Sequence, residues 1–127
     1  MASAALSGRR VLVVEDVLLV ADMIAEALTN VGCEIVGPVA RRERGLVLAR
    51  EMSIECAVLD INLDGEPSFP IAEVLQERGI PFLFVTGYGA ETVMPEPLRA
   101  VPRLAKPFHV HELLAALTGC CDTTGTG

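Results

Sequence analysis

The sequence is poor in residues that would point to several large functional classes. It has no tryptophan and one tyrosine, and aromatic residues make up 4% of its 127 positions, so a core must consist mainly of Val, Leu, Ile and Ala. Seventeen acidic residues against ten basic ones give a formal charge of −7. Direct nucleic-acid binding needs clustered Lys and Arg to neutralise phosphates, so this balance argues against such a partner.

Metal-binding cysteine pairs and long apolar runs are also absent. No two of the four cysteines have the C-x2-C spacing of a zinc site, and Cys33 and Cys56 fall in expected strands as small buried hydrophobes. No apolar run approaches the length of a membrane span, and residues 1–10 lack the apolar stretch of a signal peptide. We therefore expect a soluble cytoplasmic protein with no membrane contact.

Strand-like and helix-like segments alternate, which predicts a parallel sheet with helices on both faces. The expected strands are Val11–Val14, Cys33–Val36, Cys56–Leu59, Ile80–Val85 and Val101–Ala105, and Gly37-Pro38 is expected to close the second. Four helices are expected. The first runs from Val17 to a stop at Gly32, and the second covers Arg41–Met52. The third contains Ile71 and ends at Gly79, and the fourth contains Val110 to Leu117. Prolines and glycines in 87–102 leave room for only one or two helical turns.

The length predicts one domain, which we place at residues 9–119. Residues 1–8 are expected to be a flexible lead, and the Gly/Thr-rich residues 120–127 a disordered tail. The basic cluster of Arg41, Arg42 and Arg44 is interpreted as a solvated helix face.

Four of the apolar runs end at, or one residue before, a polar residue whose side chain can bind a metal or a phosphoryl group. Glu15-Asp16 follows the first run, Asp60 the third, Thr86 the fourth and Lys106 the fifth. If the runs are parallel strands, these side chains meet at the carboxyl edge of one sheet, where open α/β sheets bind ligands. Each residue alone is common in caps, turns or strands, so the prediction depends on their joint occurrence.

Three carboxylates and two donors at one edge permit phosphoryl chemistry. Magnesium prefers oxygen ligands, and a divalent cation would restore the ionised form of carboxylates whose crowding raises their pKa. Ionised Asp60 could then attack a phosphoryl group, while Lys106 and Thr86 donate hydrogen bonds to its oxygens.

This order of motifs resembles the receiver domain of two-component response regulators. The resemblance covers about Arg9 to Thr118 and rests on Val-Leu-Val-Val-Glu-Asp (11–16), Leu-Asp-Ile-Asn-Leu (59–63), Phe-Val-Thr-Gly-Tyr (84–88) and Lys-Pro-Phe (106–108). It implies a flavodoxin-like, doubly wound sheet of five parallel strands in the order 2-1-3-4-5, with two helices on one face and three on the other.

The resemblance also implies roles for the edge residues. Asp60 would be the phosphoacceptor for a phosphohistidine on a histidine kinase or phosphotransfer protein, with Thr86 and Lys106 holding the phosphoryl group and Lys106-Pro107 in the cis form. The implied ligands of Mg²⁺ (or Mn²⁺) are Glu15, Asp16, Asp60 and the main-chain carbonyl of Asn62. Slow self-phosphorylation from small donors and self-dephosphorylation are expected rather than enzymatic turnover, in a monomer or weak dimer.

One departure concerns signal transmission. Typical receivers carry Tyr or Phe three residues before the Lys, where this chain has Arg103, and Thr-Gly-Tyr resembles a subgroup named for Phe-x-Thr-Gly-Tyr that is often stand-alone. We expect the state of Thr86 to be read out through residues 87–102. Asn62 and Tyr88 lie where receivers tune attack by water: Tyr88 could shield the acyl phosphate, and Gly87 leaves access open.

The leading hypothesis is a stand-alone signalling or phosphorelay receiver without an output domain. The alternative is a pseudo-receiver that serves as an interaction domain without accepting phosphate, against which the retained Asp60, Thr86 and Lys106 argue. A flavodoxin-like cofactor binder needs a phosphate-cradling loop after its first strand, and Glu15-Asp16 would repel an anion there. A phosphatase of related topology places its nucleophile after the first strand with a second Asp two residues on, which Asp16 lacks.

Overall fold

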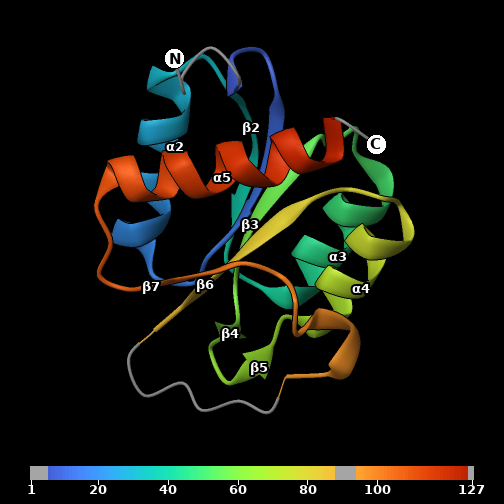
Figure 1. Cartoon of the computed structure of the whole chain (residues 1–127). Helices are drawn as coiled ribbons and strands as arrows, with labels where there is room; N and C mark the ends of the chain where they lie inside the picture. Colours follow the sequence, from blue (N-terminus) through green and yellow to red (C-terminus); the bar gives the residue numbers. More distant parts are fainter. Residues whose placement is uncertain (1–5, 88–93, 126–127) are drawn as a thin grey trace.

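The computed structural model describes residues 6–87 and 94–125, with side chains described as far as Cys121 (Figure 1). Strands and helices alternate as predicted. In chain order they are β1 (Arg10–Val14), α2 (Leu18–Asn30), β2 (Glu34–Val39), α3 (Arg42–Glu51), β3 (Cys56–Asp60), β4 (Asn62–Leu63), β5 (Glu66–Pro67), α4 (Phe69–Glu77), β6 (Phe82–Thr86), the 3-10 turn η1 (Glu96–Leu98), β7 (Arg103–Ala105) and α5 (Val110–Gly125).

The five long strands form one parallel sheet in the order β2-β1-β3-β6-β7. Because β4 and β5 form a separate antiparallel hairpin, this order is the predicted 2-1-3-4-5, and the fold class is confirmed. All five residues of the central strand β3 are buried, as expected for a strand covered on both faces. Asp60 therefore stands at the end of the most enclosed strand of the sheet.

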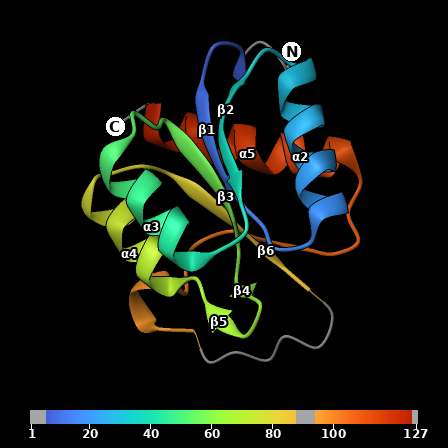
Figure 2. The ribbon, with the colours of Figure 1, turned by 180° about the vertical axis from the view of Figure 1, so that it is seen from behind.

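Two hydrophobic layers sandwich the sheet. Helices α2 and α5 cover one face and α3 and α4 the other, as the opposite views in Figures 1 and 2 show. Alternate residues of β1 point into the two layers: Val11 and Val13 toward α2 and α5, Leu12 and Val14 toward the other pair. The third helix implied for the second face is only the single turn η1 in the described residues, where nearby prolines such as Pro95 and Pro97 discourage a longer helix.

Strand β2 does not end at Gly37-Pro38 as predicted but continues through this cis peptide bond to Val39. An edge strand tolerates proline because one side needs no ladder hydrogen bonds. Gly37 has a φ of +102°, and a Cβ there would lie 2.9 Å from the carbonyl oxygen of Val13, so the position requires glycine. The extended strand lets the Val39 carbonyl accept a 3.0 Å hydrogen bond from the Glu15 N–H.

Gly45 lies inside α3, which confirms the helix predicted there. A Cβ at Gly45 would lie 2.6 Å from Cδ1 of Ile71 and 3.3 Å from Cγ2 of Val14. The glycine therefore lets α3 pack closely against both α4 and β1.

No helix in the described part of the chain combines the length and apolar character needed to span a bilayer.

Both predicted ends of the domain need correction. Leu6 is fully buried, so the flexible lead does not extend through residue 8. Helix α5 runs to Gly125, and Cys120 and Cys121 are buried, so the predicted tail does not begin at Cys120.

All four cysteines lie within the described residues, and none forms a disulfide. The thiol of Cys121 hydrogen-bonds to that of Cys56, and this bond together with burial strongly raises the pKa of Cys56. The Cys33 thiol donates to the carbonyl of Leu6 at 3.3 Å, and burial raises its pKa also. These thiols are packing residues of the α2–α5 layer, as predicted for Cys33 and Cys56.

Candidate functional site

Three carboxylates meet at the carboxyl edge of the sheet. Val14 of β1 pairs with Leu59 of β3, so the next residues, Glu15 and Asp60, stand side by side. Each of Glu15, Asp16 and Asp60 offers an oxygen within 4.8 Å of the others. Glu15 and Asp60 are 2% and 5% exposed, which is unusual for acidic side chains without a charged partner.

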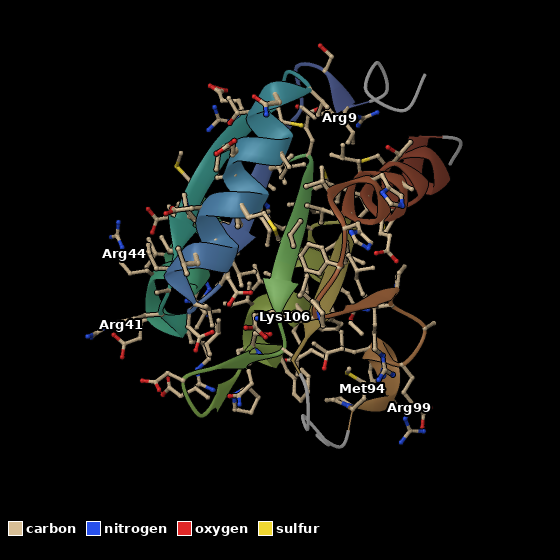
Figure 3. All side chains as sticks on the ribbon, turned by 90° about the vertical axis from the view of Figure 1, so that its left-hand side faces the viewer. Arg9, Arg41, Arg44, Met94, Arg99 and Lys106 are labelled. Atoms are coloured by element: carbon tan, nitrogen blue, oxygen red, sulfur yellow. The ribbon has the colours of Figure 1, made fainter. Side chains whose placement is uncertain are left out.

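Lys106 supplies the opposite charge. Its backbone N–H donates to the carbonyl of Thr86 at 2.9 Å, which fixes the chain after β7 beside β6. Its Nζ lies 2.8 Å from Oε1 of Glu15 and 3.0 Å from Oδ2 of Asp60. Figure 3 shows Lys106 beside the end of β3. Lys106 is the only lysine in the chain.

Burial and the neighbouring charges shift the pKa values of Asp60 and Lys106. Burial raises the pKa of the Asp60 carboxyl to about 7, with Glu15 adding to the rise and Lys106 opposing it. Burial lowers the pKa of the Lys106 ammonium, but Asp60 and Glu15 more than offset this, so the net effect is a raised pKa. Burial is thus the main cause of the raised pKa of Asp60, and the nearby ammonium only partly opposes it.

The β4–β5 hairpin contacts two of the carboxylates through backbone N–H groups. The Asn62 N–H donates to Oδ1 of Asp60 at 3.2 Å, and the Asp64 N–H donates to Oδ2 of Asp16 at 2.9 Å. Asp64 and Gly65 have φ values of 52° and 87°, the left-handed pair that a tight two-residue hairpin requires. The sequence predicted turn formers here but not their hydrogen bonds to the acidic cluster.

Thr86 ends β6 at the same edge, since Val85 pairs with Asp60 in the neighbouring strand. It is partly exposed, and within the described part of the chain its hydroxyl donates only a long 3.4 Å hydrogen bond to the Gly87 carbonyl. No atom of the described residues lies within 4 Å of where a Cβ at Gly87 would stand. The predicted shield, Tyr88, lies outside the described residues.

Arg103, which occupies the position of the usual aromatic switch, is exposed on the edge strand β7 opposite Phe84.

Arg42 was predicted to lie on a solvated helix face, but it contacts the hairpin. Its guanidinium lies 3.4 Å from Oε2 of Glu66 and donates to the Pro67 carbonyl at 3.2 Å. The sequence signal that could have indicated this contact is a basic residue at the start of α3 together with acidic Glu66 in the hairpin.

Exposed apolar side chains border the site at the start of α2. Val17, Leu18 and Leu19 directly follow Asp16 and are 46%, 72% and 82% exposed. The helix was predicted to begin at Val17, but α2 begins at Leu18 and its buried positions begin at Ala21. The N–H of Val17 instead donates to Oε2 of Glu15 at 2.9 Å.

The family model of the response regulator receiver domain matches residues 11–118. The chain belongs to this family. The receiver is 34% identical to the transcriptional regulatory protein TcrA of Mycobacterium tuberculosis over 115 residues, which are 87% of the chain and 45% of TcrA. It spans about half the length of the curated relatives it matches.

Solved structures agree with this assignment. SdrG from Sphingomonas melonis Fr1 is 38% identical to this receiver with a TM-score of 0.75, over 89% of this chain and 97% of SdrG. The receiver domain of the sensor histidine kinase PA1611 from Pseudomonas aeruginosa PAO1 is 21% identical with a TM-score of 0.76, over 91% of this chain and 99% of that one. That structure has a magnesium ion coordinated in its active-site cleft.

Receiver domains bind Mg²⁺ at an acidic pocket, and the residues present here fit such an ion. The converging donors, from Glu15, Asp16 and Asp60, are all carboxylate oxygens, the ligands that magnesium and manganese prefer. Three carboxylates converge beside one ammonium, and burial together with Glu15 raises the pKa of Asp60 although Lys106 opposes the rise. A divalent cation would remove this imbalance.

Proposed function

We propose that Asp60 accepts a phosphoryl group from a phosphohistidine on a histidine kinase or phosphotransfer protein. The observation that carries this proposal is the position of the Lys106 ammonium, 3.0 Å from Asp60 within a buried acidic cluster. A buried carboxylate with a cation at one oxygen and a main-chain donor at the other is held in one orientation. Such positioning is the main requirement of phosphoryl transfer.

In the proposed step, a carboxylate oxygen of Asp60 attacks the phosphorus of the phosphohistidine. The phosphohistidine reacts with its second ring nitrogen protonated, so the new P–O bond forms as the P–N bond breaks, and the imidazole leaves as a neutral ring that keeps this proton. The Lys106 ammonium and the Thr86 hydroxyl would then donate hydrogen bonds to the phosphoryl oxygens. Water later hydrolyses the acyl phosphate, which returns Asp60 to its carboxylate form and releases inorganic phosphate.

Glu15, Asp16, Asp60 and the main-chain carbonyl of Asn62 are the residues that would hold Mg²⁺ or Mn²⁺. When bound, the ion supplies positive charge that neutralises the carboxylates and the incoming phosphoryl oxygens. The ionised form of Asp60 is the nucleophile, so relief of its raised pKa favours reaction at neutral pH.

A protein donor needs a surface on which to dock beside Asp60, and the exposed start of α2 offers one. Val17, Leu18 and Leu19 lie next to the acidic cluster and present apolar area that no described residue covers. Exposed apolar side chains grouped in this way typically mark a protein interface. We assign them to contact with the histidine-bearing partner.

The stand-alone role and the cytoplasmic location remain predictions. In support of the stand-alone role, this receiver covers 97% of the SdrG chain in the solved structure, whereas it covers 45% of TcrA. The expected activity is slow phosphorylation and dephosphorylation of the receiver itself, not turnover of a substrate.

The test is to incubate the receiver with Mg²⁺ and acetyl phosphate and to measure phosphoryl addition by intact-protein mass spectrometry. Wild type should gain one phosphoryl group, gain none when EDTA is present before acetyl phosphate is added, and lose the group during a long incubation with Mg²⁺, whereas Asp60→Asn should gain none. Asp64→Asn, an acidic residue in the adjacent turn, is the matched control and should react like wild type. Absence of an Asp60-dependent adduct, together with no response to beryllium fluoride, would instead favour the pseudo-receiver.

Signal readout through residues 87–102 can be tested on the same samples. Amide hydrogen exchange should change in this segment when beryllium fluoride and Mg²⁺ are added, because Thr86 precedes it directly. Unchanged exchange there would reject this route and direct attention to Arg103 on β7 or to the α2–α5 layer.

A further inference from the structure

The β4–β5 hairpin connects the two strands that carry the acidic cluster. Its first strand follows Asp60 of β3 directly, and the Asn62 N–H contacts Oδ1 of Asp60. Its turn reaches back to β1, where the Asp64 N–H contacts Oδ2 of Asp16. The Asn62 side chain also accepts a 3.0 Å hydrogen bond from the Gly65 N–H, which closes the turn. The orientation of Asp16 therefore depends on where the hairpin lies.

Arg42 holds the second strand of this hairpin. From the first turn of α3, its guanidinium contacts Oε2 of Glu66 at 3.4 Å and the Pro67 carbonyl at 3.2 Å. Its neighbours behave differently: Figure 3 shows Arg41 and Arg44 extending away from the body of the protein. Among the described residues, neither of those two side chains has a hydrogen bond or an ion pair. One of three clustered arginines is thus committed to the hairpin.

We propose that Arg42 is a positioning residue for the metal site, acting through the β4–β5 hairpin on the carboxylate of Asp16. This inference rests on the proposed function, because the ligand it concerns is the divalent cation of that function. Arg42 itself contacts none of the proposed metal ligands. Its role is to keep the Asp64 N–H where it holds Asp16 beside Glu15 and Asp60.

Positioning and simple electrostatics predict opposite effects of removing Arg42. A positive side chain near an acidic cluster repels a cation, so its loss should strengthen Mg²⁺ binding if charge alone matters. If Arg42 positions the hairpin, its loss frees Asp16 and should weaken binding. Groups that orient metal ligands from the second shell change affinity by about tenfold to a hundredfold. Arg42 acts one contact further out and at the surface, so we expect about threefold to tenfold.

The experiment is an NMR titration of the metal-free receiver with MgCl₂, with the amides of Asn62 and Gly65 as reporters. Arg42→Ala should weaken Mg²⁺ binding about threefold to tenfold, whereas Arg41→Ala and Arg44→Ala should leave it unchanged or slightly tighter. Arg42→Lys keeps the charge but not the forked contact and should recover only part of the affinity. Amide exchange of Asp64 without metal should be faster in Arg42→Ala than in Arg41→Ala.

The outcomes separate this inference from the proposed function. If wild type binds Mg²⁺ and Arg42→Ala binds it as tightly as Arg41→Ala does, the positioning role is overturned. If wild type does not bind Mg²⁺, the proposed metal site falls, and Asp64 exchange alone decides whether Arg42 holds the hairpin. Thermal unfolding of all four variants checks that they fold equally well, as expected for substitutions at the exposed start of α3.

Discussion

The Nζ of Lys106 lies 3.0 Å from Oδ2 of Asp60, a side chain 46 positions earlier in the chain. The same ammonium lies 2.8 Å from Glu15, so one cation serves two buried carboxylates. An ion pair in such a place is costly to break, because removing one partner leaves a buried charge without compensation.

Lys106→Met should therefore destabilise the metal-free receiver by about 2 kcal/mol at pH 8. Loss of the ammonium raises the pKa of Asp60 further, so protonation should relieve the penalty at pH 5. Urea unfolding at both pH values, with Arg103→Met as a control at an exposed cation, measures the difference. An equal loss at the two pH values would contradict the charge-based explanation.

Stability without metal should fall as pH rises from about 4 to about 7. The folded-state pKa of Asp60 is raised to about 7 from an ordinary value of 3.8, so between these values the folded state holds more protons than the unfolded state. Stability then decreases with pH, by at most about 1.4 kcal/mol per pH unit from this group, and levels off above its folded pKa.

Thermal unfolding at pH 5.5 and pH 8, with and without Mg²⁺, measures this effect. Asp60→Asn should flatten the pH dependence and stabilise the metal-free protein at pH 8. Mg²⁺ should stabilise wild type more at pH 8 than at pH 5.5, because it binds the ionised carboxylates. A metal-free receiver that gains stability between pH 5.5 and pH 8 would show that Asp60 ionises freely.

Leu18→Asp should slow phosphoryl transfer from a protein donor without affecting transfer from acetyl phosphate. Leu18 is 72% exposed beside the site, so an apolar contact there is lost while the acidic cluster stays intact. A reduction of about tenfold or more, equivalent to about 1.4 kcal/mol, is expected with a phosphorylated histidine kinase or phosphotransfer protein that reacts with wild type. Val47→Asp, on α3 of the opposite layer, is the control. Equal slowing with the protein donor and with acetyl phosphate would show that Leu18→Asp impairs phosphoryl transfer at Asp60 itself and not docking of the partner.

Two helical glycines should respond differently to substitution. Gly119 in α5 has open space around its missing Cβ, so Gly119→Ala should stabilise by up to about 1 kcal/mol through helix propensity. In Gly45→Ala the same gain is offset by the contact with Ile71 and Val14, and Gly45→Leu should cost about 3 kcal/mol through overpacking. Urea unfolding measures the free energy of unfolding of these three variants against wild type. A stabilised Gly45→Leu variant would mean that α3 is free to move off the sheet.

Much of the fold was predictable because its rules are local or periodic. Short apolar runs separated by helical patterns indicate a parallel sheet, and parallel strands bring their carboxyl ends to one edge. Glu15, Asp60 and Lys106 could therefore be placed together although they lie far apart in the sequence. The strand order came from the family resemblance, since alternation alone does not select it.

The errors occur where tertiary contacts override a local rule. Gly37-Pro38 is a local stop signal, but an unpaired strand edge tolerates it, and β2 continues to Val39. Val17 fits the helical period, but it precedes α2 as its N-cap, and its side chain is 46% exposed. Arg42 contacts Glu66 and Pro67 only because the hairpin folds back over α3, which no pattern within either segment indicates.

The burial of every cysteine, and of most of the only lysine, gives this receiver a surface that resists common bioconjugation reagents. Maleimides need an accessible thiolate, yet burial raises the pKa of Cys33 and Cys120, as it does that of Cys56 together with its bond to Cys121. Lys106 has a raised pKa and is held between carboxylates. A cysteine introduced at exposed Asp64 would therefore be the one readily labelled thiol, and a fluorophore there would sit on the turn that contacts Asp16.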